Sequence, residues 1–336
     1  MYRIRTSLGR AARLRAAAGL LVLCTACADD GAGPSSPADS PGDPSAGLPS
    51  APGESIDPAA LTLDNRSSRP GIVFASFSMS NAYLDKVHTG WMSGGSLDPS
   101  NIISNLSGAR ARGGRVVIKL CKGRDKYVKN SDGTFSLTKW KALVSRYKSV
   151  NLQPYITDGT IIGHYLIDEP HRPQRWGGKG ISQKTLEEMA RFSKQLWPGM
   201  PAIVRVAPSW LASSSIQYRY VDAGWTQYTS NKGNAASWVA AEAAAAKRKG
   251  LGLVVGLNVL DGGNGSSKIR GFTSGKWAMS ASEIRSYGNA MLGESLACAF
   301  FNWTHDRTFY GRSDIRSAMA DVSARAKAHS RTSCRQ

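Results

Sequence analysis

Two adjacent carboxylates, Asp168 and Glu169, end a run of mostly apolar residues in the segment GHYLIDEPHRP, residues 163–173. Pro170 disfavours helical geometry at the residue before it, so Glu169 is expected to be extended and its side chain to be aimed by the turn. A carboxyl group in a partly desolvated pocket can keep its proton and donate it near neutral pH. The segment therefore predicts acid–base chemistry, and a surface turn is the alternative interpretation.

Short apolar runs alternate with amphipathic stretches along most of the chain. The predicted strands are 71–77, 115–121, 152–156, 163–168, 202–206, 222–225 with the preceding Tyr-Val, 251–257 and 297–302, and the predicted helices are 101–112, 136–149, 182–196, 235–249, 282–292 and 314–329. This alternation predicts an α/β protein with a single (β/α)8 barrel (TIM barrel). The short connection after 152–156 leaves a doubly wound open sheet as the alternative, although no nucleotide-binding glycine fingerprint follows the first strand.

Active sites of such barrels lie at the C-terminal ends of the strands, where Asp168 and Glu169 are predicted. Asp168-Glu169-Pro170 resembles the Asn-Glu-Pro motif that ends strand four in the glycoside hydrolase (β/α)8 superfamily. The resemblance implies that Glu169 is the general acid/base of a hydrolase acting on poly- or oligosaccharides without a cofactor or metal. Asp168 replaces the Asn that contacts the substrate's 2-hydroxyl in the family, so that contact does not carry over directly, and Asp168 is expected to assist Glu169 in catalysis. A non-catalytic carbohydrate or cell-wall binding protein on the same barrel is the alternative.

Glycoside hydrolysis needs a second carboxylate, which lies about 5–5.5 Å from the first in retaining enzymes and about 6.5–9.5 Å away in inverting ones. The family supplies a Glu at the end of strand seven, whereas this chain has Asn258 and then Asp261 there. Asp261 is expected to be the nucleophile or base, and Asp222 is a second candidate for the base. Glu283 is better explained as a helix cap, since Ser280-x-x-Glu283 is a capping-box pattern.

Six of the nine tryptophans fall at predicted strand ends or in the loops that follow, as a carbohydrate cleft needs, although loop packing explains about half of them equally well. Asn302-Trp303 resembles the sugar-platform tryptophan of the same superfamily. Arg205 and Lys119 could pair with the carboxylates or hold an acidic sugar. His164 is expected to be a core residue. The six tryptophans are Trp91, Trp176, Trp210, Trp225, Trp277 and Trp303, and the substrate-binding candidates are Trp303, Asn302, Asn258, Arg205, Lys119, Trp225, Gln227, Tyr228, Trp176 and His171.

The charge of the chain is strongly positive. It holds 43 basic and 24 acidic residues, a net charge of +19. Without the five arginines of residues 1–27 and the six acids of residues 28–60, residues 61–336 hold 38 basic and 18 acidic residues. An anionic carbohydrate or a lipid headgroup is one explanation, and scattered charge for solubility is the other. No dense Lys/Arg run appears, which favours scattered charge. No nucleic-acid partner is expected, and the protein is expected to be a monomer.

The N-terminal residues have the features of an export signal. Residues 1–27 combine a basic start with a short apolar run, and Leu23-Cys24-Thr25-Ala26-Cys27 resembles the lipobox of bacterial lipoproteins. Cys27 would then be lipidated and the protein exported and anchored to the cell envelope, whereas an ordinary cleaved signal is the alternative. Residues 28–65 are predicted to be a disordered tether and 66–336 the barrel. A Cys298–Cys334 disulfide is expected, with Cys121 as a free thiol.

Overall fold

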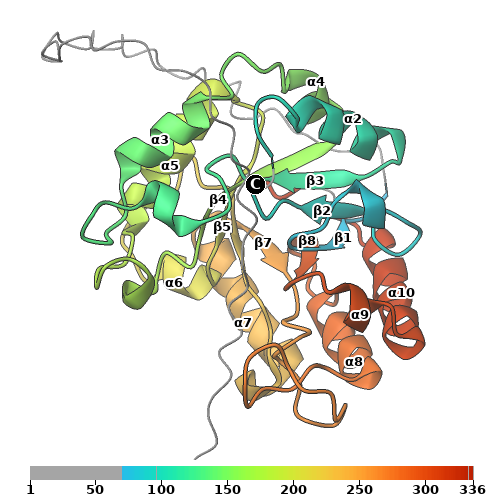
Figure 1. Cartoon of the computed structure of the whole chain (residues 1–336). Helices are drawn as coiled ribbons and strands as arrows, with labels where there is room; N and C mark the ends of the chain where they lie inside the picture. The colour runs from blue at the N-terminus through green and yellow to red at the C-terminus, as the bar shows by residue number, and fades with distance from the viewer. Residues whose placement is uncertain (1–69, 96, 332, 336) are drawn as a thin grey trace, which may run out of the picture. The chain divides into compact units, whose positions relative to one another are not determined.

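The computed structural model describes residues 70–336 except 96, 332 and 336, so the expected signal peptide, tether and Cys27 lie outside the described residues. The described chain forms an eight-stranded parallel sheet in the order β1-β8-β7-β6-β5-β4-β3-β2 (Figure 1). The strands are β1 (Phe74–Ser76), β2 (Gly90–Met92), β3 (Arg115–Ile118), β4 (Ile161–Asp168), β5 (Ala202–Arg205), β6 (Ala223–Trp225), β7 (Gly252–Val255) and β8 (Ala297–Asn302).

The two edges of this sheet meet, which makes it a barrel. Phe77, just after β1, forms a parallel bridge with Met92 at the end of β2. The Ser78 amide donates a hydrogen bond of 2.9 Å to the Met92 carbonyl, and the Thr89 amide donates one of 2.9 Å to the Phe74 carbonyl. The predicted (β/α)8 architecture is therefore confirmed, and the open-sheet alternative is wrong.

Helices surround the barrel in the described residues (Figure 1). Ser136, Ser182 and Asn234 each accept a hydrogen bond from a first-turn amide and so fix the start of a helix. No helix in the described part of the chain is long and apolar enough to cross a membrane. The α-helices are α2 (Ile102–Ala111), α3 (Leu137–Ser145), α4 (Gln153–Thr157), α5 (Gln183–Leu196), α6 (Pro208–Ala212), α7 (Ala235–Arg248), α8 (Ala281–Met291), α9 (Arg307–Tyr310) and α10 (Ser313–Lys327), and the 3-10 helices are η1 (Asn81–Tyr83), η2 (Asp125–Val128), η3 (Pro173–Arg175) and η4 (Ser230–Lys232).

One predicted strand is wrong and one real strand was missed. Residues 152–156 fall in the short helix α4, whose first turn contains Pro154. Proline is well suited to a first helical turn because its fixed φ is helical and its missing amide would have no partner there. The missing strand is β2, only three residues long and followed by Ser93-Gly94-Gly95. The structure thus has eight strands, as predicted, and helices α3 and α4 connect β3 to β4.

The interior of the barrel is closely packed. All eight residues of β4 are buried, and the Tyr165 and Trp225 rings meet with their centroids 5.9 Å apart. His164, on the same strand, is fully buried and its Nδ1 lies 2.8 Å from Ser193 Oγ on α5. Burial lowers the pKa of His164 to about 3, so the ring stays neutral at physiological pH. The expectation of a core histidine is confirmed.

A disulfide joins Cys298, at the start of β8, to Cys334 in the C-terminal segment, with a Cα–Cα distance of 4.8 Å. This is the pairing expected from the sequence, and Cys121 is a buried free thiol.

Removing this disulfide should destabilise the protein. The bond closes a loop between residues 36 positions apart. Chain-entropy arguments give a contribution of about 4 kcal/mol for a loop of that length. We expect the double change Cys298→Ser and Cys334→Ser to lower the free energy of unfolding by about 2–4 kcal/mol, measured by urea denaturation. Reduction of the wild type should give a loss of the same size, and an unchanged unfolding free energy in the double variant would contradict the prediction.

Candidate active site

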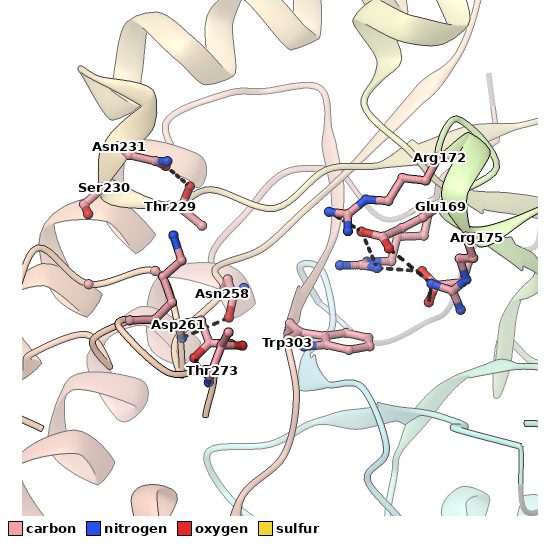
Figure 2. Close-up of a pocket in the computed structure, with 15 residues that line it drawn as sticks. Glu169, Arg172, Arg175, Thr229, Ser230, Asn231, Asn258, Asp261, Thr273 and Trp303 are labelled. Atoms are coloured by element: carbon pink, nitrogen blue, oxygen red, sulfur yellow. Dashed lines mark hydrogen bonds and ion pairs between the residues drawn. The ribbon is translucent and has the colours of Figure 1, made fainter. Parts of the chain in front are cut away.

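The C-terminal ends of the strands surround a cavity of about 590 Å³. Asp168 ends β4, Arg205 ends β5 and Trp303 directly follows β8, so three strands bring these side chains to the same end of the barrel. Figure 2 shows Glu169 and Asp261 at opposite sides of the cavity with Trp303 between them in this view. The lining residues are Asp168, Glu169, Arg172, Arg175, Arg205, Thr229, Ser230, Asn231, Asn258, Asp261, Gly262, Gly263, Thr273, Lys276 and Trp303.

The backbone at Glu169 is left-handed, with φ of +45°, and not extended as the following proline predicted. This conformation costs a non-glycine residue about 1–2 kcal/mol and persists only where the surroundings enforce it. Two hydrogen bonds hold it: the Glu169 amide donates to the Arg205 carbonyl at 3.1 Å, and Trp176 Nε1 donates to the Glu169 carbonyl at 3.0 Å. The tight turn fixes the direction in which the Glu169 carboxylate enters the cavity.

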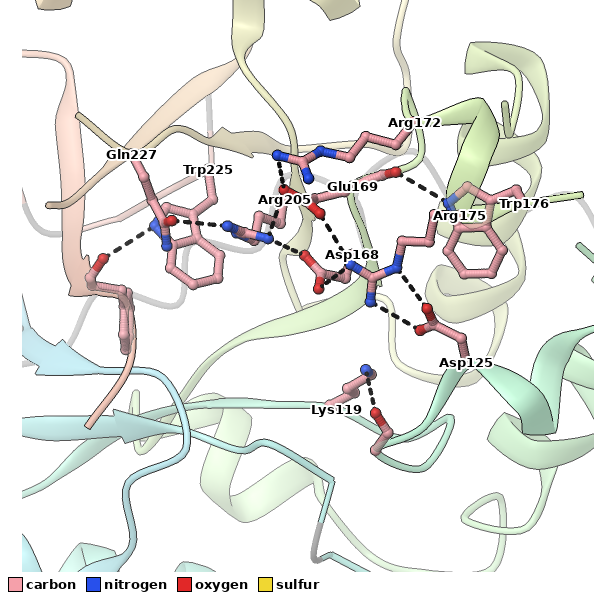
Figure 3. Close-up of polar contacts among 12 residues, drawn as sticks. Lys119, Asp125, Asp168, Glu169, Arg172, Arg175, Trp176, Arg205, Trp225 and Gln227 are labelled. Carbon is pink, nitrogen blue, oxygen red and sulfur yellow. Dashed lines mark hydrogen bonds and ion pairs between the residues drawn. The ribbon is translucent and has the colours of Figure 1, made fainter. Parts of the chain in front are cut away.

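Three guanidinium groups surround the Glu169 carboxylate (Figure 3). One oxygen lies 2.9 Å from Arg172 and 3.2 Å from Arg205, and the other lies 3.1 Å from Arg175. The Glu169 side chain is 13% exposed, whereas the Arg172 side chain is 59% exposed. The Arg172 pair is therefore the solvent-exposed and weakest member of this group, since exposed ion pairs contribute about 0–1 kcal/mol.

Asp168 is the main counter-ion of the two more buried arginines. Its oxygens lie 2.6 Å from Arg205 Nη1 and 2.7 Å from Arg175 Nη1, closer than those of Glu169. Burial alone raises the pKa of Asp168, but the charges of Arg205 and Arg175 outweigh it, so the pKa is lowered. Arg205 also donates to Gln227 at 2.9 Å, and Arg175 pairs with Asp125 at 2.6 Å. Asp168 thus fixes the two guanidinium groups, a role different from the one that the Asn at this position has in the family.

Asp261 lies across the cavity and anchors a hairpin. Its two oxygens accept hydrogen bonds from the Thr273 amide at 2.8 Å and the Thr273 hydroxyl at 2.7 Å. Asn258 Oδ1 accepts from the Asp261 amide at 3.2 Å. The structure brings Glu169 and Asp261 to one cavity, and both carboxylates already have partners within the protein.

Trp303 lines the cavity, as a sugar platform would, but its ring is partly covered. Phe77 stacks on it at 4.7 Å between centroids with 14° between the planes. The Arg205 guanidinium carbon lies 4.4 Å from the Trp303 centroid. Arg205 therefore contacts the Asp168 and Glu169 carboxylates at the end of β4 and also the Trp303 ring after β8.

Several expected substrate contacts are core residues instead. Asn302 is fully buried and its amide nitrogen lies 3.7 Å from Met319 Sδ on α10, so it faces away from the cavity. Tyr228 packs on Trp238 and Tyr287, with centroids 5.4 and 4.8 Å away. Besides Asn302, three of the expected contacts are at most 3% exposed and do not line the 590 Å³ cavity: Trp176, Tyr228 and Lys119. Trp225 is equally buried but lines a smaller pocket beside Glu169 and Arg205. Loop or core packing explains Trp91, Trp176 and Trp225, half of the six tryptophans.

Asp222 is wrong as a candidate base because it lies at the other end of the barrel. It precedes β6, and its carboxylate is 2.6 Å from Lys194 and accepts the Ala202 amide at 2.6 Å. Glu283 forms the expected capping box with Ser280 at the start of α8.

The sequence left several cavity residues unrecognised. Arg172 and Arg175 follow Glu169 by three and six positions, a spacing that carries a signal only once the turn is known. Lys232 lines an adjoining pocket of about 260 Å³, together with Gln227, His171 and Trp225, which the sequence does indicate as candidates. Among the described residues, no group of three or more His, Cys, Asp and Glu could hold a metal ion. The other unrecognised lining residues are Thr229, Ser230, Asn231, Thr273 and Lys276.

No protein-family model and no curated protein matches this chain. Solved structures do share its fold. The glycoside hydrolase family 2 β-galacturonidase from Eisenbergiella tayi, bound to galacturonate, is 9% identical with a TM-score of 0.50, over 77% of this chain and 51% of that one. A family 5 mannosidase from Rhizomucor miehei is 10% identical with a TM-score of 0.48, over 79% and 96% of the two chains. The catalytic domain of the major endoglucanase from Xanthomonas campestris pv. campestris is 11% identical with a TM-score of 0.47, over 81% and 99%.

This chain spans about half the length of the galacturonidase. At these identities the likeness shows the fold alone, a (β/α)8 barrel.

Proposed function

We propose that this protein is a glycoside hydrolase acting on a poly- or oligosaccharide, with Glu169 as the general acid. The observation that carries the proposal is the placement of Glu169 after β4 and Asp261 after β7 around a single cavity. Glycoside hydrolysis needs two carboxyl groups on either side of the scissile bond. Asn258, Thr229 and Ser230 add polar groups to the lining, as recognition of sugar hydroxyls requires.

In this proposal Asp168 and Glu169 have different roles: Asp168 holds the arginines, and Glu169 reacts with the substrate. Asp168 holds Arg205 and Arg175 at 2.6 and 2.7 Å, so these two charges keep a partner when Glu169 is engaged. A sugar that enters the cavity displaces the exposed Arg172 from Glu169. Glu169 takes up a proton from solvent and gives it to the glycosidic oxygen as the bond to the anomeric carbon breaks. Asp261 acts on the opposite face, either as the nucleophile that bonds to that carbon or as the base that takes a proton from the attacking water.

A second candidate is a saccharide-binding protein that does not cleave its ligand. One observation favours it: both oxygens of Asp261 accept hydrogen bonds from Thr273, which is what a structural carboxylate does. A partner carboxylate would have to break these bonds before reacting.

A hydrolysis screen separates the two candidates. The whole protein, in detergent, is incubated with neutral and acidic polysaccharides, and new reducing ends are counted. New ends, lost in a Glu169→Gln variant, would support the hydrolase. Retention of one polymer by both proteins without cleavage would replace it with the binding protein.

We further propose that the protein is exported and anchored through a lipid on Cys27. The Cys298–Cys334 disulfide supports the export part, because disulfides persist in oxidising compartments outside the cytoplasm. The anchor follows from the resemblance of residues 23–27 to a lipobox.

Replacing Cys27 should release the protein from the membrane. We expect a Cys27→Ser variant to move from the membrane fraction to the soluble fraction, and the wild type to carry the mass of a diacylglyceryl group on its N-terminal cysteine. Fractionation and mass spectrometry measure both, with Cys24→Ser as the control. A soluble wild type without added mass would contradict the lipid anchor.

A further inference from the structure

The segment after β7 forms a hairpin beside the cavity, residues 270–277. Arg270 and Trp277 make an antiparallel bridge, and the Gly271 amide donates to the Lys276 carbonyl at 2.8 Å. Asp261 ties the hairpin to the cavity through Thr273. A Cβ at position 271 would lie 2.6 Å from an Asp261 oxygen, which explains the glycine there. The hairpin is therefore held firmly against the cavity wall.

Phe272 lies near the tip of this hairpin and is 85% exposed. No other large hydrophobic side chain in the described residues is more than 40% exposed. A single exposed aromatic is common on protein surfaces and by itself indicates nothing. Here its neighbour Thr273 and the nearby Lys276 line the cavity, so Phe272 stands at the rim of the candidate active site.

The hairpin and the residues around it are cationic. Residues 262–282 contain Lys268, Arg270 and Lys276 and no acidic residue. All three side chains are exposed, and none of them is in an ion pair within the described part of the chain. The adjoining pocket adds Lys232. A ligand leaving the cavity along the hairpin meets positive charge and an aromatic face.

We propose that the 270–277 hairpin is a binding arm for a uronic-acid polysaccharide, in which Phe272 stacks on a sugar ring outside the cavity. Lys276, Lys268 and Arg270 pair with the carboxylates of the same polymer. An aromatic face complements the C–H face of a sugar ring. The three cations complement the carboxylates of the polysaccharide, which carries one on each sugar unit. This inference rests on the proposed function, because it names the substrate class of that site.

Calorimetric titration of the whole protein in detergent tests the arm. The probes are hexagalacturonate, the neutral cellohexaose and polyphosphate, an anion without sugar rings. We expect hexagalacturonate to bind most tightly. Phe272→Ala should weaken its binding about tenfold, which is the size of a good aromatic stacking contact, and leave the salt dependence unchanged. Lys276→Gln should reduce the salt dependence, since it removes a screened charge contact.

Two matched variants test whether losing exposed apolar area or exposed charge elsewhere on the surface has the same effect. Ile103→Ala truncates another exposed hydrophobic side chain, on α2, and Lys148→Gln removes an exposed charge just beyond α3. Both should bind hexagalacturonate like the wild type. The proposed binding arm would be overturned if Phe272→Ala and Ile103→Ala weakened hexagalacturonate binding equally. It would also be overturned if polyphosphate bound as tightly as hexagalacturonate. Tight binding without any cleavage would instead overturn the hydrolase and leave the arm standing.

Discussion

Replacing Glu169 by glutamine should reduce the rate of glycoside hydrolysis by about 10²–10⁴-fold, the usual contribution of a general acid. Glutamine keeps the shape of the side chain but has no acidic proton to give to the leaving oxygen. The loss should be much smaller on an aryl glycoside whose leaving group is already acidic, because that group departs without protonation. Initial rates on a natural oligosaccharide and on the aryl glycoside measure both effects.

A distant glutamate provides the control for this variant. Glu188 lies on α5 and pairs with Lys141 at 2.6 Å and with Arg191 at 2.8 Å. Glu188→Gln removes an ionised carboxylate of the same type outside the cavity and should leave both rates unchanged. Unchanged rates in Glu169→Gln as well would remove Glu169 from the mechanism.

Replacing Asp168 by asparagine should lower the free energy of unfolding by about 3 kcal/mol or more, the cost of leaving buried charges without a partner. Asp168 is 7% exposed and Arg205 13%, and the pair is 2.6 Å long. Without the Asp168 charge, Arg205 keeps the Glu169 carboxylate at 3.2 Å and the neutral Gln227 at 2.9 Å. Urea denaturation measures the difference in unfolding free energy.

The matched control is an exposed ion pair. Asp98 lies 3.1 Å from Arg146 and is 49% exposed. Asp98→Asn should therefore cost less than about 1 kcal/mol. Equal losses of unfolding free energy in Asp168→Asn and Asp98→Asn would show that the burial of Asp168 does not determine its contribution to stability.

The Asp168 contribution should also depend on pH. Its pKa is lowered in the folded protein, so the unfolded chain takes up this proton first as pH falls. The stabilisation is fully present above pH about 4, near the ordinary aspartate value, and is lost as pH falls through the folded pKa. The gap between wild type and Asp168→Asn should shrink over the same range.

The barrel could be predicted from the sequence because its strands are buried on both faces and read as continuous apolar runs. The exceptions have local causes. Gly90-Trp91-Met92 is too short to give a periodic signal. Leu152 to Ile156 is a short segment with apolar ends that resembles a strand, although Pro154 lies in the first turn of a helix. Adjacent apolar residues alone do not separate a short strand from a short helix.

The site was predictable only in part. Asp168, Glu169, Arg205, Asp261, Asn258 and Trp303 do line one cavity. Asn302 and Tyr228 were misassigned because the end of a strand does not reveal which side chains face the cavity and which face the helices. The arginines at 172 and 175 depend on the left-handed turn at Glu169, a tertiary feature that the following proline argues against.

The described chain enters the barrel just before β1 and so at the end of the strands opposite to the cavity. At that end the Ile72 amide donates to the Ala326 carbonyl of α10 at 2.9 Å, and Arg115 donates to the Gly71 carbonyl at 2.7 Å. Residues 70–73 and the mouth of the cavity therefore lie at opposite ends of the barrel, so a polymer reaches the mouth without meeting the described start of the chain.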